Sequence, residues 1–267
     1  MSATLHGHEA RASRAIVALA TLAAFLAVEY LHPMLLKALG GTDALIDNAL
    51  DVFIWIYTPY WLVPLLLAAA MFGFKRAWFA LGLAAPIPVA LAFGFVCTLP
   101  MLIGYATYGS IDREALTTSR ILQSSVYPGV FEEVLYRAML FGLLFRFAGW
   151  GFLPAALIGA VVFGAAHLWQ GRDTIEAIGV GVATGIGAVW FAWLYAEWRD
   201  NLWVPIVFHV LMNLYWSVFQ MGDNALGGHA ANVFRMTTIL LSIVLTILWW
   251  RGRGGRIVVG PRWWRGG

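Results

Sequence analysis

Three charged residues, Glu132, Glu133 and Arg137, lie within a stretch of sequence that is otherwise apolar. If this stretch is helical, Glu133 and Arg137 are spaced i, i+4 with the acid first, which is the favourable order for an ion pair. Glu132 then points about 100° away from Glu133 around the helix. We therefore expect Arg137 to neutralise Glu133 and to leave Glu132 without a partner on its own helix. Such a carboxylate in a low-dielectric cavity suits a general base, although the three charges could instead only hold helices together.

Two further pairs of residues stand out in apolar sequence downstream. Phe163 is followed four residues later by His167, and His209 is followed four residues later by Asn213. A single histidine near a membrane surface is commonly a structural group, so His167 alone indicates little. His209 and Asn213 share one helical face, where they could serve either a site or interhelical hydrogen bonding.

Together these side chains fit two hydrolytic chemistries. In the first, Glu132 and His167 activate water, and His209 and Asn213 donate hydrogen bonds to the oxyanion of a tetrahedral intermediate. In the second, Glu132, His167 and His209 hold a zinc ion that keeps one position open for water. The sequence has no His-Glu-x-x-His motif, and Asn213 is a poor zinc ligand. It therefore favours the first chemistry, which requires no cofactor.

The elements that must position these residues are membrane helices. Apolar residues make up 61% and charged residues 12% of the 267-residue chain, whereas an average soluble domain has about 25% charged residues. This composition excludes a water-soluble enzyme, and the excess positive charge is too scattered to bind nucleic acid. The sequence predicts an all-α polytopic bundle of about eight transmembrane helices. We expect these spans at 15–36, 52–72, 77–102, 126–147, 150–169, 175–198, 202–220 and 233–250.

Several local features refine this organisation. Prolines at positions 86, 88 and 100 predict kinks or a break in the third span. The polar stretch 111–125 indicates an amphipathic or re-entrant surface segment, and the tail 251–267 is expected to be unstructured. We divide the chain into three parts: the first three spans with the amphipathic segment (1–125), the catalytic core (126–220), and the last span with a basic tail (221–267).

The distribution of Lys and Arg over the loops favours a cytoplasmic location for both termini. We expect an integral protein of a prokaryotic inner membrane whose first apolar run is a retained helix rather than a cleaved signal peptide. In this orientation Glu132 lies about 9 Å below the outer boundary and His209 about 10 Å above the inner one. A core of about 30 Å then leaves roughly 10 Å between their depths, a mismatch that tilt or shifted span boundaries could remove.

The three motifs resemble the CAAX protease and bacteriocin-processing enzyme family, which includes the type II CAAX prenyl endopeptidases, or Ras-converting enzymes. That family is similar in its ordered pattern of Glu-Glu-x-x-x-Arg, Phe-x-x-x-His and His-x-x-x-Asn, which stand here at Glu132–Arg137, Phe163–His167 and His209–Asn213. The resemblance covers roughly residues 127–220. It implies an eight-helix bundle with a hydrated catalytic chamber inside the membrane.

By this resemblance Glu132 is the general base, His167 assists it, and His209 with Asn213 forms the oxyanion site. Glu133, Arg137 and Phe163 then support the chamber. The family has been described both as metalloproteases and as glutamate-type proteases, so zinc stays possible. The implied partners are membrane lipid and a membrane-anchored or lipidated peptide, although the motifs do not require a CAAX substrate.

A second class of function uses the same buried groups without catalysis. A proton-coupled carrier or an immunity-type binding protein could relay protons or hold a partner with them, although the sequence has no evident inverted repeats. Haem held by His167 and His209 would give a visible absorption band. Glu29 and His32, spaced i, i+3 in the first span, indicate a structural polar contact rather than a functional one.

Overall fold

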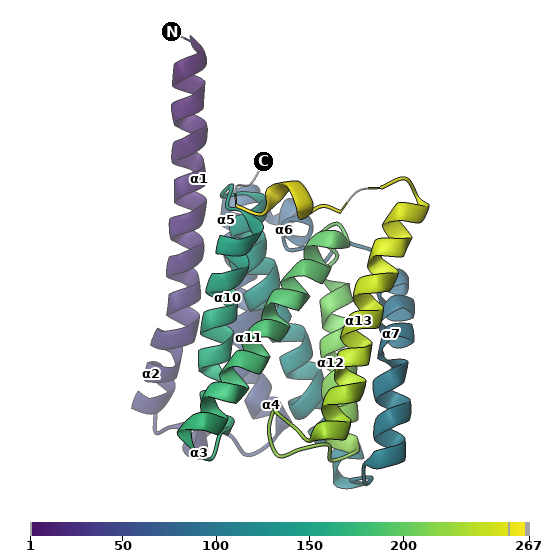
Figure 1. Ribbon diagram of the computed structural model, residues 1–267. Helices are drawn as coiled ribbons and strands as arrows, with labels where there is room; N and C mark the ends of the chain where they lie inside the picture. Colours follow the sequence, from purple (N-terminus) through teal and green to yellow (C-terminus); the bar gives the residue numbers. More distant parts are fainter. Residues whose placement is uncertain (1, 256, 265–267) are drawn as a thin grey trace.

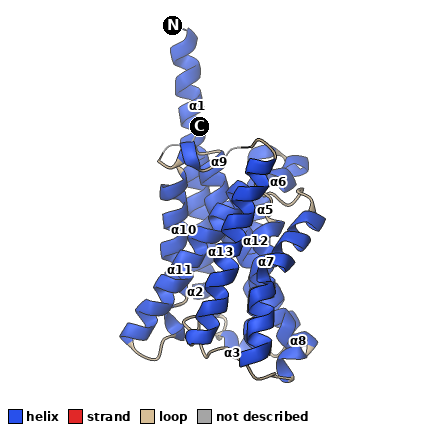
Figure 2. Ribbon diagram, turned by 45° about the vertical axis from the view of Figure 1, so that its right-hand side comes forward, coloured by secondary structure: helices blue, strands red, loops and turns tan. Residues whose placement is uncertain are grey.

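The protein is helical throughout, with no strand in residues 2–255 and 257–264, which its computed structural model describes (Figure 2). Side chains are described from residue 13 onward. An all-α polytopic membrane protein is thereby confirmed, and in this part of the chain six helices are long and apolar enough to cross a bilayer. They are Ser13–Ala38, Ala49–Phe72, Ile87–Tyr108, Phe152–Gln170, Thr174–Glu197 and His229–Gly252.

The two remaining expected spans differ from these six in ways that matter for the site. Helix α12 (Trp203–Val218) is apolar but has only 16 residues, which corresponds to about 24 Å. The other is a continuous helix over 118–146, built from α8 (Thr118–Ile121), η4 (Leu122–Val126), η5 (Pro128–Leu143) and α9 (Leu144–Arg146). It carries the three charges of the first motif. The expected count of eight spans is therefore not confirmed.

The helix over 118–146 has π-helical hydrogen bonding along η4 and η5. Such bonding is rare and occurs frequently at functional sites. Every residue of η5 from Glu133 onward is buried, because helices α1 (Ser2–Leu26), α5 (Thr58–Phe72), α10 (Phe152–Ala166) and α12 pack against it. In Figure 1, α1 borders the bundle on one side, whereas α7 (Ile87–Tyr108) and α13 (His229–Gly252) border the other. The first motif therefore lies at the centre of the bundle.

The third expected span is broken, as its prolines predict. Helix α6 (Phe74–Ala80) ends before a turn, and α7 begins directly after Pro86, whose backbone is extended. Gly82 in this turn has a φ of +75°, and a Cβ atom there would collide with the carbonyl oxygen of Asp200. Only glycine meets both requirements at this position.

Helices α10 and α11 (Thr174–Glu197) approach each other closely through small residues. A Cβ atom on Gly164 would collide with the carbonyl oxygen of Gly181, and one on Gly185 would lie 3.1 Å from the carbonyl oxygen of Ala160. Small residues permit this kind of backbone approach in membranes, where no hydrophobic force drives helices together. The contact fixes the end of α10, from which His167 projects.

The expectation of an unstructured tail is wrong for residues 257–264. Val259 is fully buried, and the backbone N–H groups of Val258 and Val259 donate to the two carboxylate oxygens of Glu197 at 2.8 and 2.9 Å. The ring of Trp263 packs against that of Phe152, with centroids 5.6 Å apart. The tail therefore crosses the end of the bundle near the N-terminal half of α1, as Figure 1 shows. Its anchor, a buried acid on another helix, has no local signal in the sequence.

Candidate active site

Glu133 joins the first motif to the third. Its side chain is fully buried, and its Oε1 lies 2.7 Å from Nδ1 of His209 on α12. Its Oε2 lies 3.0 Å from Nε of Arg137, so the expected i, i+4 ion pair is present. The contact with His209 was not expected. It makes Glu133 the acceptor that fixes the orientation of the imidazole ring, as carboxylates do for functional histidines in other sites.

Arg137 is held between aromatic rings. Its side chain is 2% exposed, and its guanidinium lies 4.6 Å from the ring centre of Phe163 on α10 and 5.3 Å from that of Phe191 on α11. Cation–π contacts of this kind contribute about 2 kcal/mol when desolvated. Phe163 was expected to support the site because of its motif. Phe191 was not, because no sequence spacing connects α11 to the motifs.

Glu132 lies near the His209 imidazole, on the side opposite to Glu133. Its Oε2 is 4.0 Å from Nε2 of His209, and its side chain is 17% exposed. A separation of 4.0 Å is too long for a direct hydrogen bond but allows one water to contact both atoms. The two adjacent glutamates therefore contact opposite nitrogens of one histidine. The helical wheel separated Glu132 from Glu133 correctly, but it could not show that His209 lies between them.

His167 caps the C-terminal end of α10 and is partly exposed. Its Nδ1 lies 2.7 Å from the carbonyl oxygen of Phe163 and donates to it, which leaves Nε2 free as an acceptor. Its ring is 4.4 Å from that of Phe163, which in turn covers Arg137. His167 thus borders the cluster through Phe163, and among the described residues it has no hydrogen bond to Glu132.

Asn213 lies one turn beyond His209 on α12 and is partly exposed. No side chain in the described part of the chain forms a hydrogen bond with its carboxamide, so both its donors are available to a ligand. The structure therefore brings Glu132, Glu133, Arg137 and His209 into direct proximity. It places His167 and Asn213 at the border of the cluster.

The mismatch in depth between Glu132 and His209 is absent from the structure, since their side chains lie 4.0 Å apart. Two features account for this. Helix α12 is shorter than a bilayer core, so His209, in its N-terminal half, is still close to the middle of the bundle. Gly129 also lets α12 approach η5, because a Cβ atom there would lie 2.8 Å from the backbone nitrogen of Val210. Val210 is next to His209, so this close approach brings the His209 imidazole near Glu132 and Glu133.

The donor set does not form a zinc site in this structure. Across residues 2–255 and 257–264, no group of three His, Cys, Asp or Glu side chains is arranged to hold a metal ion. Nδ1 of His209 is occupied by Glu133, and His167 donates to a backbone carbonyl.

Residues 114–215 match a family model described as type II CAAX prenyl endopeptidase Rce1-like. This segment is therefore similar to that family. It contains all three motifs and the helices that carry them, so the resemblance inferred from the motifs is confirmed over these residues. The segment also contains Phe191 and Gly129, which the motifs do not include.

A curated protein of Bacillus subtilis strain 168, named "Putative membrane peptidase YdiL", is similar to the chain, with 32% identity over 130 residues. This alignment covers 45% of the chain and 48% of the relative, so the chain spans about half the length of that protein. No solved structure matches the chain.

Proposed function

We propose that this protein is an intramembrane endopeptidase, which hydrolyses a peptide bond of a membrane-anchored or lipidated substrate. The observation that carries the proposal is the position of His209 between Glu132 and Glu133. A partly exposed carboxylate and an oriented imidazole face one another across a gap of 4.0 Å, which suits a bound water. The Rce1-like match over 114–215 and the similarity to a protein named as a membrane peptidase support the same activity.

In the proposed reaction Glu132 is the general base. It accepts a proton from the water, and the oxygen of that water attacks the carbonyl carbon of the scissile peptide bond. Glu132 then delivers the proton to the amide nitrogen as the carbon–nitrogen bond breaks, which yields a carboxylic acid and an amine and restores the Glu132 carboxylate. The free Nε2 of His167 assists by accepting a hydrogen bond from the water or the departing amine.

The tetrahedral intermediate carries a negative charge on the former carbonyl oxygen. We assign its stabilisation to Nε2–H of His209 and the carboxamide of Asn213, which lie one turn apart on α12. This assignment requires an N–H on both ring nitrogens of His209, so that Nδ1–H donates to Glu133 and Nε2–H donates to the oxyanion. Arg137 balances the charge of Glu133 and holds it in place.

The proposal requires no metal or other cofactor, and membrane lipid is the natural surrounding of the substrate. We further propose a location in a prokaryotic inner membrane with both termini in the cytoplasm. The distribution of Lys and Arg supports this orientation, and the start of α1 and the turn Gly260–Arg262 lie toward the same end of the bundle (Figure 1). Reporter fusions to each terminus would test it, and opposite locations would contradict it.

The decisive experiment is cleavage of membrane-anchored peptides by the purified chain and by Glu132→Gln. We expect the variant to lose activity by at least about 10²-fold, because general base catalysis contributes this much or more. Glu114→Gln is the matched control, since Glu114 is an exposed acid just before the same helix. Undiminished cleavage by Glu132→Gln would refute the assignment. No cleavage of any peptide by the unmodified chain, together with ion-driven uptake in proteoliposomes, would favour a carrier.

A further inference from the structure

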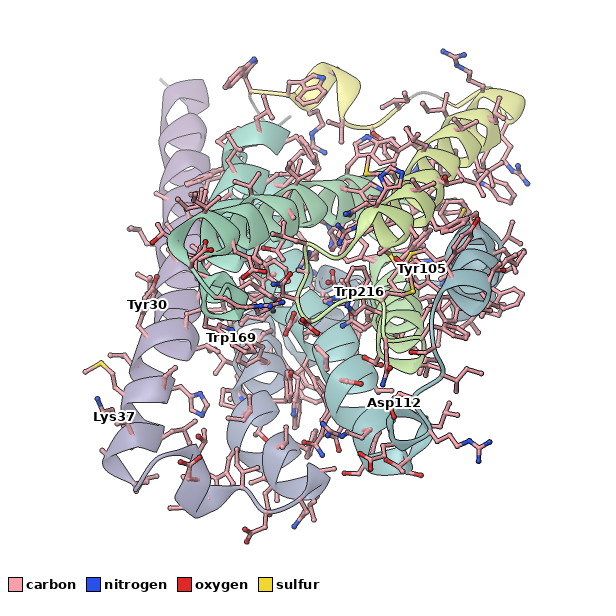
Figure 3. All side chains as sticks on the ribbon, turned by 60° about the horizontal axis from the view of Figure 1, so that its bottom comes forward. Tyr30, Lys37, Tyr105, Asp112, Trp169 and Trp216 are labelled. Carbon is pink, nitrogen blue, oxygen red and sulfur yellow. The ribbon has the colours of Figure 1, made fainter. Side chains whose placement is uncertain are left out.

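A third carboxylate borders the candidate site from outside the Rce1-like segment. Glu29 lies in the π-helical turn η1 (Ala27–Leu31) of the first span. Its Oε1 is inaccessible to solvent and has no partner at hydrogen-bond geometry among the described residues. The neighbouring Tyr30 is 54% exposed and lies on the outer side of the helix (Figure 3). Glu29 therefore faces the interior of the bundle.

Two phenol hydroxyls approach the Glu29 carboxylate, from Tyr60 on α5 and Tyr136 on η5. Tyr136 lies four residues after Glu132 on η5, and its ring lies 5.3 Å from that of Phe25, which is four residues before Glu29 on the first span. The ring of Tyr57 lies 5.6 Å from that of Tyr60 and extends this aromatic wall. Glu29 therefore lies close to Tyr136, on the helix that carries the general base.

No described basic side chain compensates the charge of Glu29. His32, one turn along the same helix, is held by the backbone of Trp55. Arg137 is paired with Glu133 and covered by aromatic rings. The groups that face Glu29 are two phenols.

An acid in a membrane interior is costly and normally has a partner. A carboxylate beside tyrosine rings is also a suitable receptor for a cation, because the ring faces attract positive charge as the carboxylate does. A purely structural contact with two phenols would not require an acid, since an amide could accept the same hydrogen bonds.

We propose that Glu29, with Tyr60 and Tyr136, forms a subsite that receives a Lys or Arg side chain of the substrate close to the scissile bond. Glu29 is then a specificity-determining residue, contributed by the first helix rather than by the matched segment. This inference rests on the proposed peptidase function and adds to it a class of substrate.

The test uses the full chain and pairs of membrane-anchored peptides that differ at one position. Each pair carries either lysine or its neutral analogue norleucine, and the position is moved along the peptide through the cleavage site. We expect kcat/KM for one lysine peptide to exceed that of its norleucine partner by about tenfold, because a buried polar site discriminates strongly against an analogue that leaves it unpaired. Glu29→Gln should abolish this preference, so that the two peptides of the pair are cleaved with equal kcat/KM.

Two further variants separate specificity from folding and from overall charge. Glu29→Asp keeps the charge and should keep the preference for lysine. Asp43→Asn removes one exposed acid at the end of the first span and should change nothing. If the unmodified chain cleaves the peptides without preferring lysine, or if Glu29→Gln keeps the preference, the subsite is refuted while the peptidase function stands.

A binding measurement covers the case in which no peptide is cleaved and the peptidase function itself fails. In the Glu132→Gln background, the lysine peptide should raise the melting temperature more than the norleucine peptide does, because binding to the folded state stabilises it. Adding Glu29→Gln should make the two peptides equivalent. Equal stabilisation by both peptides before that change would overturn the subsite.

Discussion

Replacing Glu133 by Gln removes the anion that holds Arg137 inside the bundle. The glutamine can still accept a hydrogen bond from His209, so the main loss is the ion pair with Arg137, whose side chain is 2% exposed. Leaving a buried charge without its partner costs about 3–5 kcal/mol. For a chain of this size that corresponds to a decrease in melting temperature of roughly 6–20 °C.

Glu132→Gln is the matched comparison, because it makes the same chemical change at the adjacent residue. Glu132 is partly exposed, and its Oε2 lies 4.0 Å from Nε2 of His209, too far for a direct hydrogen bond, so we expect a change in stability within about 1 kcal/mol. Both variants should lose cleavage, but only Glu133→Gln should melt early. The difference isolates the role of Arg137 from the loss of catalysis.

The assay is thermal unfolding of both purified variants in the same detergent, followed by intrinsic tryptophan fluorescence. The double variant Glu133→Gln with Arg137→Met should recover much of the lost stability, since an apolar side chain leaves no unpaired charge. Equal melting temperatures for Glu133→Gln and Glu132→Gln would refute the reasoning. Failure of the double variant to recover would show that Arg137 is not the source of the loss.

Three further predictions follow from particular contacts. Gly129→Ala should push α12 away at Val210 and reduce cleavage by about 10²-fold, because it misplaces His209. Gly187→Ala is the control and should be neutral, since a Cβ atom there meets no atom within 4 Å. Equal cleavage rates for the two variants would contradict the packing argument. Glu197→Gln should release the tail at Val259, because it weakens two charge-assisted hydrogen bonds. Tryptic cleavage after Arg262 in this tail should then be about tenfold faster. An unchanged rate of digestion would contradict the role of Glu197 in anchoring the tail. Treatment with a chelator, with zinc content measured in parallel, should leave peptide cleavage intact, and activity that is lost on chelation and restored by zinc would reverse the assignment of a metal-free mechanism.

Much of the fold could be predicted from apolar run lengths, because the bilayer imposes a minimum length on a spanning helix. The long spans required nothing more, and the break before Pro86 was indicated by the prolines of the third span. Two elements escaped this reasoning. Helix α12 is too short for the rule because protein surrounds it, and the docked tail contacts a buried acid more than fifty residues earlier in the chain.

The sequence predicted which residues belong to the site better than it predicted the contacts between them. The i, i+4 spacing was sufficient to pair Glu133 with Arg137, because neighbours on one helix are fixed by helical geometry. The contact between Glu133 and His209 joins residues 76 positions apart in the sequence. Phe191 and Tyr60 show the same limit, since their contacts with Arg137 and Glu29 depend on how separate helices pack.

The sequence by itself determined that the chain is a helical membrane protein and which charged residues lie within its spans, because the cost of polar groups in lipid is a local property of each segment. Only the tertiary structure decided that two adjacent glutamates face opposite nitrogens of one histidine, and that an acid from the first helix lies close to Tyr136 on the helix of these glutamates. These arrangements depend on crossing points between helices. Small residues such as Gly129 set those points, and their effect appears only when two helices meet.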